Sequence, residues 1–169
     1  MSILTTFEIL ELYKKTILNF LDDLIQILPE EADLIMLRIL FENQIPVDES
    51  MKKFSKRLFT KIKVKEISSK RLFGKTKTEN EMEISPADMI REKNDKFFLE
   101  NSDIIFGEEK NDDKDKETRR KEKITRWKNI WESKSLGNDN KESIWKWTSV
   151  LLKLAEMYVK NEAYQLQFI

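Results

Sequence analysis

The chain has 169 residues, a length typical of one domain, and its 40% hydrophobic content is sufficient for a core. It contains no cysteine and no histidine. This composition excludes disulfide frameworks, thiol chemistry, His/Cys zinc sites and nucleophilic sites with a histidine base. The 31 basic and 31 acidic residues cancel, and a neutral chain is not typical of strong non-specific nucleic-acid binding.

The longest uninterrupted helical pattern runs from Leu4 to Leu28. Its apolar residues recur every three or four positions, which places them on one face of a helix. Thr5 with Glu8 predicts a capping box at the start, and Pro29 predicts the end. We interpret this segment as a central core helix, with an oligomerisation helix as the alternative. We expect no membrane span, because charged side chains interrupt the run at Lys14, Lys15, Asp22 and Asp23.

Two shorter helical patterns follow, separated by a turn at Asn43–Pro46. Residues Leu34–Phe41 read LIMLRILF and are apolar on nearly every side, which predicts a helix buried in the core. The apolar residues of segment 47–62 recur every three or four positions and predict a helix with one apolar face. We therefore expect three packed helices in the first 60 residues.

The pattern changes at residues 61–65, KIKVK, where apolar and basic residues alternate as in a half-buried strand. A return strand within residues 71–78 would complete a small hairpin, and a flexible basic loop is equally consistent. Residues 79–83 are polar and acidic and are interpreted as a connector. We treat residues 61–83 as a basic insertion.

The second half of the chain again predicts helices. Ser85, Pro86 and Asp88 have the positions of an N-cap, a first-position proline and a first-turn acid. Residues 107–118 contain no apolar residue and predict a mobile acidic loop. Apolar stripes over 124–131 and 144–158 predict two more helices. The predicted fold class is therefore all-α, a single-domain bundle of five or six helices over residues 1–169, with a small β-hairpin near 61–78 as an option.

Charge is segregated along the chain. Residues 1–50 hold 3 basic and 10 acidic side chains, residues 51–78 hold 11 and 1, residues 79–117 hold 6 and 14, and residues 118–169 hold 11 and 6. The basic block can neutralise phosphates or bind an acidic partner, and it can equally pair with the acidic blocks of this chain. Its candidate binding residues are Lys52, Lys53, Lys56, Arg57, Lys61, Lys63, Lys65, Lys70, Arg71, Lys75 and Lys77.

No motif predicts catalysis. Pairs of adjacent carboxylates, such as those at 22–23 and 112–113, point in different directions on a helix. The three glycines are isolated, so no phosphate-binding loop is present, and the acidic loop lacks the calcium-loop spacing. We expect no enzyme activity, no metal, no cofactor and no small-molecule substrate.

The four tryptophans all lie after residue 126. Trp145 and Trp147 would point about 200° apart on a helix, so at least one leaves the apolar stripe. An exposed tryptophan is typical of interface anchors. We choose Trp145 as the predicted anchor.

Three separated blocks, Phe20–Pro46, Met89–Asn101 and Lys141–Tyr158, resemble small uncharacterised helical proteins encoded by large nucleocytoplasmic DNA viruses. The resemblance covers about 60 of the 169 residues. It implies a virus-encoded protein without enzymatic activity, acting in the host cytoplasm, in virus factories or in the virion.

The sequence therefore predicts a non-catalytic protein-interaction or structural accessory protein that binds a protein partner or self-associates. The alternative is a nucleic-acid-associated accessory protein that binds the phosphate backbone through residues 52–77.

Overall fold

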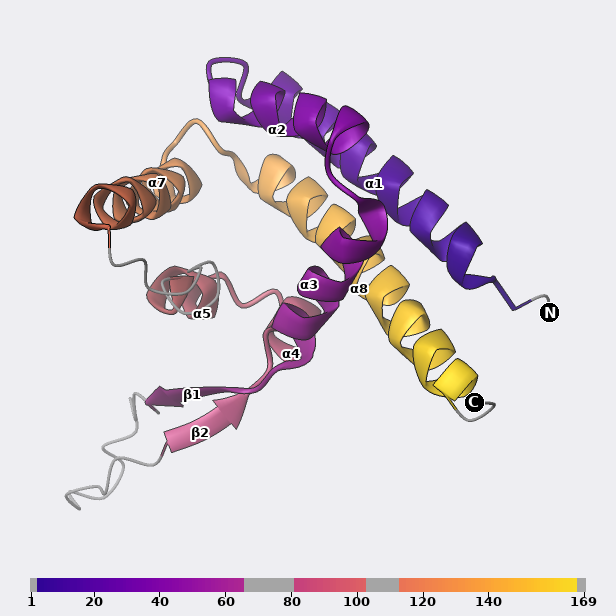
Figure 1. Ribbon diagram of the computed structural model, residues 1–169. Coiled ribbons are helices and arrows are strands. Elements are labelled where there is room, and N and C mark those ends of the chain that lie inside the picture. The colour runs from indigo at the N-terminus through magenta and orange to yellow at the C-terminus, as the bar shows by residue number, and fades with distance from the viewer. Residues whose placement is uncertain (1–2, 66–80, 103–112, 167–169) are drawn as a thin grey trace. The chain divides into compact units, whose positions relative to one another are not determined.

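A computed structural model describes residues 3–65, 81–102 and 113–166 of the chain (Figure 1). These ranges contain seven helices and one two-stranded antiparallel sheet. The predicted all-α class with a small hairpin is therefore confirmed. The chain divides into two compact units, one of Met1–Leu58 with Ile130–Ile169 and one of Phe59–Asn129. Each unit is described by itself.

The first unit contains four helices: α1 (Thr6–Ile27), α2 (Ala32–Asn43), α3 (Val47–Phe59) and α8 (Asn138–Leu166). The boundary of the unit falls within α3, after Leu58. The predicted capping box begins α1, because the Glu8 N–H donates to the Thr5 hydroxyl and the Thr5 N–H donates to the Glu8 carboxylate. The helix ends at Ile27, two residues before Pro29, because a proline disfavours helical geometry in the residue before it.

Helices α1 and α8 pack side by side in opposite directions (Figure 1). At one end the Trp147 indole N–H donates to the Asp23 carboxylate at 2.6 Å, and the Trp147 ring stacks on Phe20. At the other end the Asn161 side chain donates to the Leu4 carbonyl at 2.8 Å. Helix α2 also packs against α1, so α1 is the central helix of this unit, as its pattern predicts.

Tyr13 of α1 joins the core of the unit to both α2 and α3. Its ring stacks on Phe54 of α3 with centroids 5.9 Å apart and meets Phe41 of α2 edge-on at 6.1 Å. Its hydroxyl shares a 2.9 Å hydrogen bond with Ser50. The other buried apolar residues of this unit are Ile9, Leu21, Leu34, Met51, Leu58, Leu136, Trp145, Leu151, Leu152, Leu154, Ala155 and Tyr158.

The second unit contains β1 (Ile62–Lys65), β2 (Glu81–Ile84), α4 (Pro86–Arg91), α5 (Asp95–Glu100) and α7 (Lys114–Glu132). The boundary of the unit falls within α7, after Asn129. Met89 and Phe97 form its buried cluster, with Ile62, Ile84 and Phe98 packed against them. Ser85 caps α4 as predicted, accepting a hydrogen bond from the Asp88 N–H.

The hairpin forms with a different return strand from the predicted one. Strand β1 pairs with residues 81–84, of which the sequence analysis placed 81–83 in a connector. In the observed register Ile62 lies opposite Ile84 and Lys63 opposite Glu83, so this strand offers β1 an apolar partner and an opposite charge. Residues 66–80 lie outside the described residues.

Helix α7 begins at Lys114, so residues 114–118 are helical and not part of the predicted loop; residues 107–112 lie outside the described residues. Ion pairs one turn apart stabilise such a charged helix, as between Arg120 and Glu117 at 2.6 Å. None of the helices in the described ranges combines the length and the apolar content that crossing a membrane requires.

Candidate interaction surfaces

Helix α2 is apolar around most of its circumference but buries only one side. Leu34 and Phe41 are 4% and 5% exposed, whereas Ile35, Met36 and Ile39 keep exposures of 44%, 58% and 49%. The prediction that the whole helix is buried is therefore wrong, because its neighbours cover the side of Leu34 and Phe41 alone. We call Ile35, Met36 and Ile39 the α2 apolar face.

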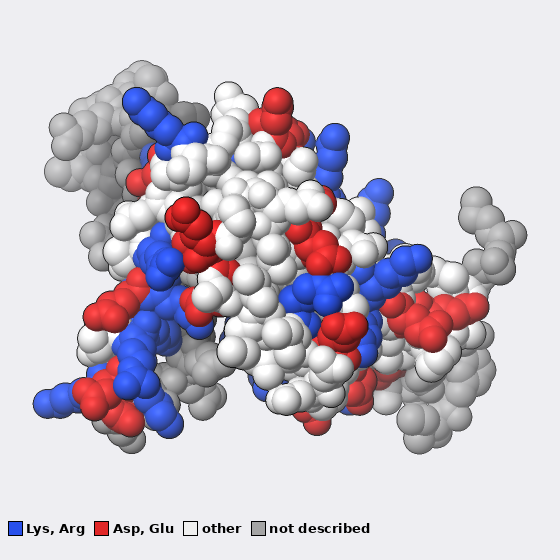
Figure 2. Space-filling view, turned by 90° about the horizontal axis from the view of Figure 1, so that it is seen from above, with Lys and Arg blue, Asp and Glu red and all other residues white. Residues whose placement is uncertain are grey.

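The α2 apolar face is continuous because its three residues are neighbours on the helix surface. Ile39 lies four positions after Ile35 and three after Met36, which places all three within an arc of about 100°. Figure 2, seen from above, shows a broad area without charged side chains, with both basic and acidic side chains at its edges.

An ion-pair network lies beside this face. The Arg38 guanidinium donates to both carboxylate oxygens of Asp22 on α1 and to the Glu42 carboxylate at 2.9 Å. The hydrogen bond to Asp22 raises the pKa of Arg38 above its ordinary value. The network holds α2 against α1 from one side. The only cation of α2 is thus engaged with two carboxylates.

Helix α3 has one buried side and an opposite side that is charged and exposed. Met51, Ser55 and Leu58 are buried. The opposite side carries Lys52, Lys53, Lys56 and Arg57, all exposed, which we call the α3 basic face. Within the described part of the chain, the side chains of Lys52, Lys53 and Arg57 make no hydrogen bond or ion pair. The α3 basic face therefore offers positive charge to a partner.

The strand part of the predicted basic block has a different environment. Lys61 and Lys63 are exposed, and the register places Lys63 opposite Glu83 and Lys65 opposite Glu81. Opposite charges across an antiparallel pair attract each other. Lys63 thus lies opposite an acidic residue of its own hairpin. The remaining predicted positions, Lys70, Arg71, Lys75 and Lys77, lie outside the described residues.

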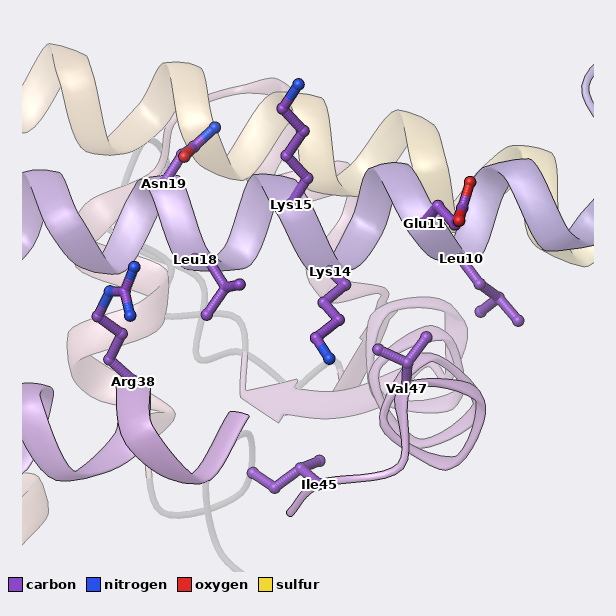
Figure 3. A pocket seen from close by; sticks show the side chains of 9 residues that line it. All are labelled: Leu10, Glu11, Lys14, Lys15, Leu18, Asn19, Arg38, Ile45 and Val47. Carbon is purple, nitrogen blue, oxygen red and sulfur yellow. The ribbon is translucent and has the colours of Figure 1, made fainter. Parts of the chain in front are cut away.

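An open groove of about 410 Å³ lies between α1 and the segment that joins α2 to α3. Figure 3 shows Lys14 pointing into it toward Ile45 and Val47. The Lys14 ammonium donates to the Glu42 carbonyl at 3.1 Å, which anchors the last turn of α2 to α1. Glu11 is the only carboxylate in the lining, so the groove brings no two carboxylates together.

Trp145 is not the exposed anchor that the sequence analysis chose. It is 9% exposed, and its ring packs edge-on against Trp131 at 5.9 Å. The Lys141 ammonium lies 5.3 Å from the centre of the Trp131 ring. The prediction was wrong because the second indole covers the first, which spacing along one helix does not show.

The exposed residues of α2 were missed as a candidate site. Their signal was present in the sequence, since only Arg38 interrupts the apolar run of Leu34–Phe41. A helix that is apolar all round needs neighbours on all sides, and four helices do not supply them here. Within the described ranges, no cluster of three or more acidic side chains has the arrangement of a metal site. Comparison of the chain with family models, curated proteins and solved structures returned no match.

Proposed function

We propose that this protein is a non-catalytic interaction protein that binds a protein partner through the α2 apolar face. The observation that carries the proposal is the 44–58% exposure of three large aliphatic side chains on one helix. Contiguous exposed apolar surface of this kind is typical of protein–protein interaction sites. A partner that covered the three side chains would remove apolar area from water, which is the main favourable term in association.

A designed peptide that takes the place of the partner tests the proposal. The probe is a fluorescently labelled amphipathic helix with a leucine stripe and otherwise glutamine, so that it carries no charge. We expect saturable binding to the full chain by fluorescence anisotropy. The double variant Ile35→Ser/Ile39→Ser should weaken this binding by about tenfold or more, because two apolar contacts are lost.

The matched control is Val150→Ser/Val159→Ser on α8. These valines are 44% and 42% exposed and lie in the same unit, so the control removes similar apolar surface elsewhere. It should bind the peptide like the unmodified chain. Equal binding by all three proteins, with unchanged circular dichroism, would contradict a role for the α2 apolar face.

A second candidate function, nucleic-acid backbone binding, is supported by the α3 basic face. Lys52 and Lys53 are each followed one turn later by another cation, which produces two rows of positive charge along the helix. Such a surface neutralises phosphates and releases counterions. It is unsuited to insertion into a membrane, because the apolar side of α3 is already buried.

This second function is tested with labelled single- and double-stranded DNA and RNA at low and high salt. The variant changes Lys52, Lys53, Lys56 and Arg57 to glutamine, and the control changes Lys134, Lys146, Lys153 and Lys160, which are also exposed, to glutamine. We expect salt-sensitive binding that the first variant loses and the control keeps. Equal losses in both variants would indicate a response to net charge and not to the α3 basic face.

The resemblance to helical proteins of large DNA viruses stays a prediction, and so does a location in the host cytoplasm, virus factories or the virion. Neither proposal depends on it, since both are drawn from exposed faces of helices in the first unit.

A further inference from the structure

We propose that the partner of the α2 apolar face is an amphipathic helix whose apolar stripe is flanked by lysine and arginine. This inference rests on the proposed function and adds the shape and the charge of the partner. Exposure alone would suit any apolar partner. The ridges of side chains on α2 and the charges beside them favour a helix with basic flanks.

The shape of the face suits a helix. Ile35 and Ile39 form one ridge along the i, i+4 direction, and Ala32, Met36 and Leu40 form the next ridge beside it. Two helices commonly pack by placing such a ridge of one into the groove between two ridges of the other. The small side chain of Ala32 allows a partner backbone to approach closely at one end of the groove.

The segment that carries the face is acidic. Residues 30–43 contain four acidic side chains, Glu30, Glu31, Asp33 and Glu42, and a single basic one, Arg38. Glu30, Asp33 and Glu42 are exposed. Arg38 pairs with Asp22 and Glu42, and the acidic side chains of this segment still outnumber this single cation. A partner whose flanking residues are basic gains from this potential, and one with acidic flanks is repelled.

The same charges disfavour a second copy of this chain as the occupant. In a twofold dimer the same surface meets itself, so the acidic border of one α2 would lie against the acidic border of the other.

The test compares three labelled peptides with the same leucine stripe and with lysine, glutamine or glutamate on the flanks. We expect the lysine peptide to bind the full chain about tenfold more tightly than the glutamine peptide at low salt, and the glutamate peptide to bind most weakly. High salt should reduce these differences, because it screens exposed charges.

Two variants separate the contribution of apolar contacts to peptide binding from that of the acidic side chains. Ile35→Ser/Ile39→Ser should weaken binding of all three peptides. Glu30→Gln/Asp33→Asn/Glu42→Gln should remove the preference for lysine and leave binding of the glutamine peptide unchanged. Glu11→Gln/Glu49→Gln/Asp139→Asn is the control with the same change in net charge, at exposed positions away from the face, and should keep the preference.

The outcomes distinguish the inference from the proposed function. Equal affinity for the three peptides, lost in the serine variant, would overturn the inference about charge and leave the interaction through α2 standing. Absence of binding to every peptide, or binding unaffected by the serine variant, would overturn both. A dimer in sedimentation velocity that the serine variant abolishes would identify a second copy as the occupant and overturn the inference.

Discussion

Helices α2 and α3 follow each other in the chain and have nearly equal lengths, 12 and 13 residues, yet their surfaces differ. Helix α3 buries its apolar side and exposes its charges, as an amphipathic helix in water does. Helix α2 also buries an apolar side, but its opposite side is apolar too and remains exposed. The surface of α3 is consistent with solubility alone, while that of α2 is typical of a surface that a partner covers.

The largest expected effect comes from truncating a buried side chain of α3. Met51 is fully buried, so Met51→Ala should lower the free energy of unfolding by about 2–5 kcal/mol, from lost burial and the cavity that remains. Urea denaturation followed by circular dichroism measures it. A cost below about 1 kcal/mol would indicate that α3 is not held against the unit as described.

An intermediate effect is expected at Tyr13, the residue that contacts both helices. Tyr13→Phe keeps the ring contacts with Phe41 and Phe54 and removes the hydrogen bond to Ser50. The expected loss is about 1 kcal/mol in the free energy of unfolding at neutral pH. Ser50→Ala should cost a similar amount, and the double variant should cost less than the sum of the two.

The buried Tyr13 hydroxyl also makes the free energy of unfolding depend on pH. Burial raises the pKa of Tyr13 above the ordinary value of 10.0, with a smaller opposite effect from Ser50. The unfolded chain then loses the proton first, so this contribution to stability is complete below about pH 10 and is lost as the pH rises through the raised pKa. The free energy of unfolding of the Tyr13→Phe variant should therefore fall less with rising pH above about pH 10 than that of the unmodified chain. Part of the pH dependence should remain, because burial also raises the pKa of Tyr158.

A smaller effect is expected from the ion pair that joins α2 to α1. A double-mutant cycle with Arg38→Gln and Asp22→Asn should give a weak favourable coupling, because both side chains are partly exposed. Thermal unfolding at low and high salt measures it, and the coupling should decrease with salt. A coupling that salt does not change would indicate a pair shielded from solvent.

The smallest effect is expected on the α2 apolar face. Met36 is 58% exposed, so Met36→Ala should change the free energy of unfolding by no more than about 0.5 kcal/mol. It forms a matched pair with Met51→Ala, since the same atoms are removed from two neighbouring helices. A cost at Met36 close to that at Met51 would mean that the face is covered within the chain itself, which contradicts the proposed function.

Local patterns predicted much of this fold. The capping box of α1, the cap of α4 and the amphipathic character of α3 depend on residues within one or two turns of each other, so their spacing is informative. The same periodicity places Lys52, Lys53, Lys56 and Arg57 on the side opposite the apolar face, and the structure shows that they are exposed. The burial of Trp145 could not be predicted this way, because it depends on Trp131 from another helix.

By itself the sequence determined the all-α class, the helix boundaries near prolines and caps, and the charged side of α3, because each depends on the order of neighbouring residues. Only the tertiary structure decided that β1 pairs with residues 81–84 and that α2 leaves Ile35, Met36 and Ile39 uncovered. The physical reason is that a helix apolar on all sides has no side marked for burial. Which side faces solvent then depends on how many neighbours the fold supplies and from which direction they pack.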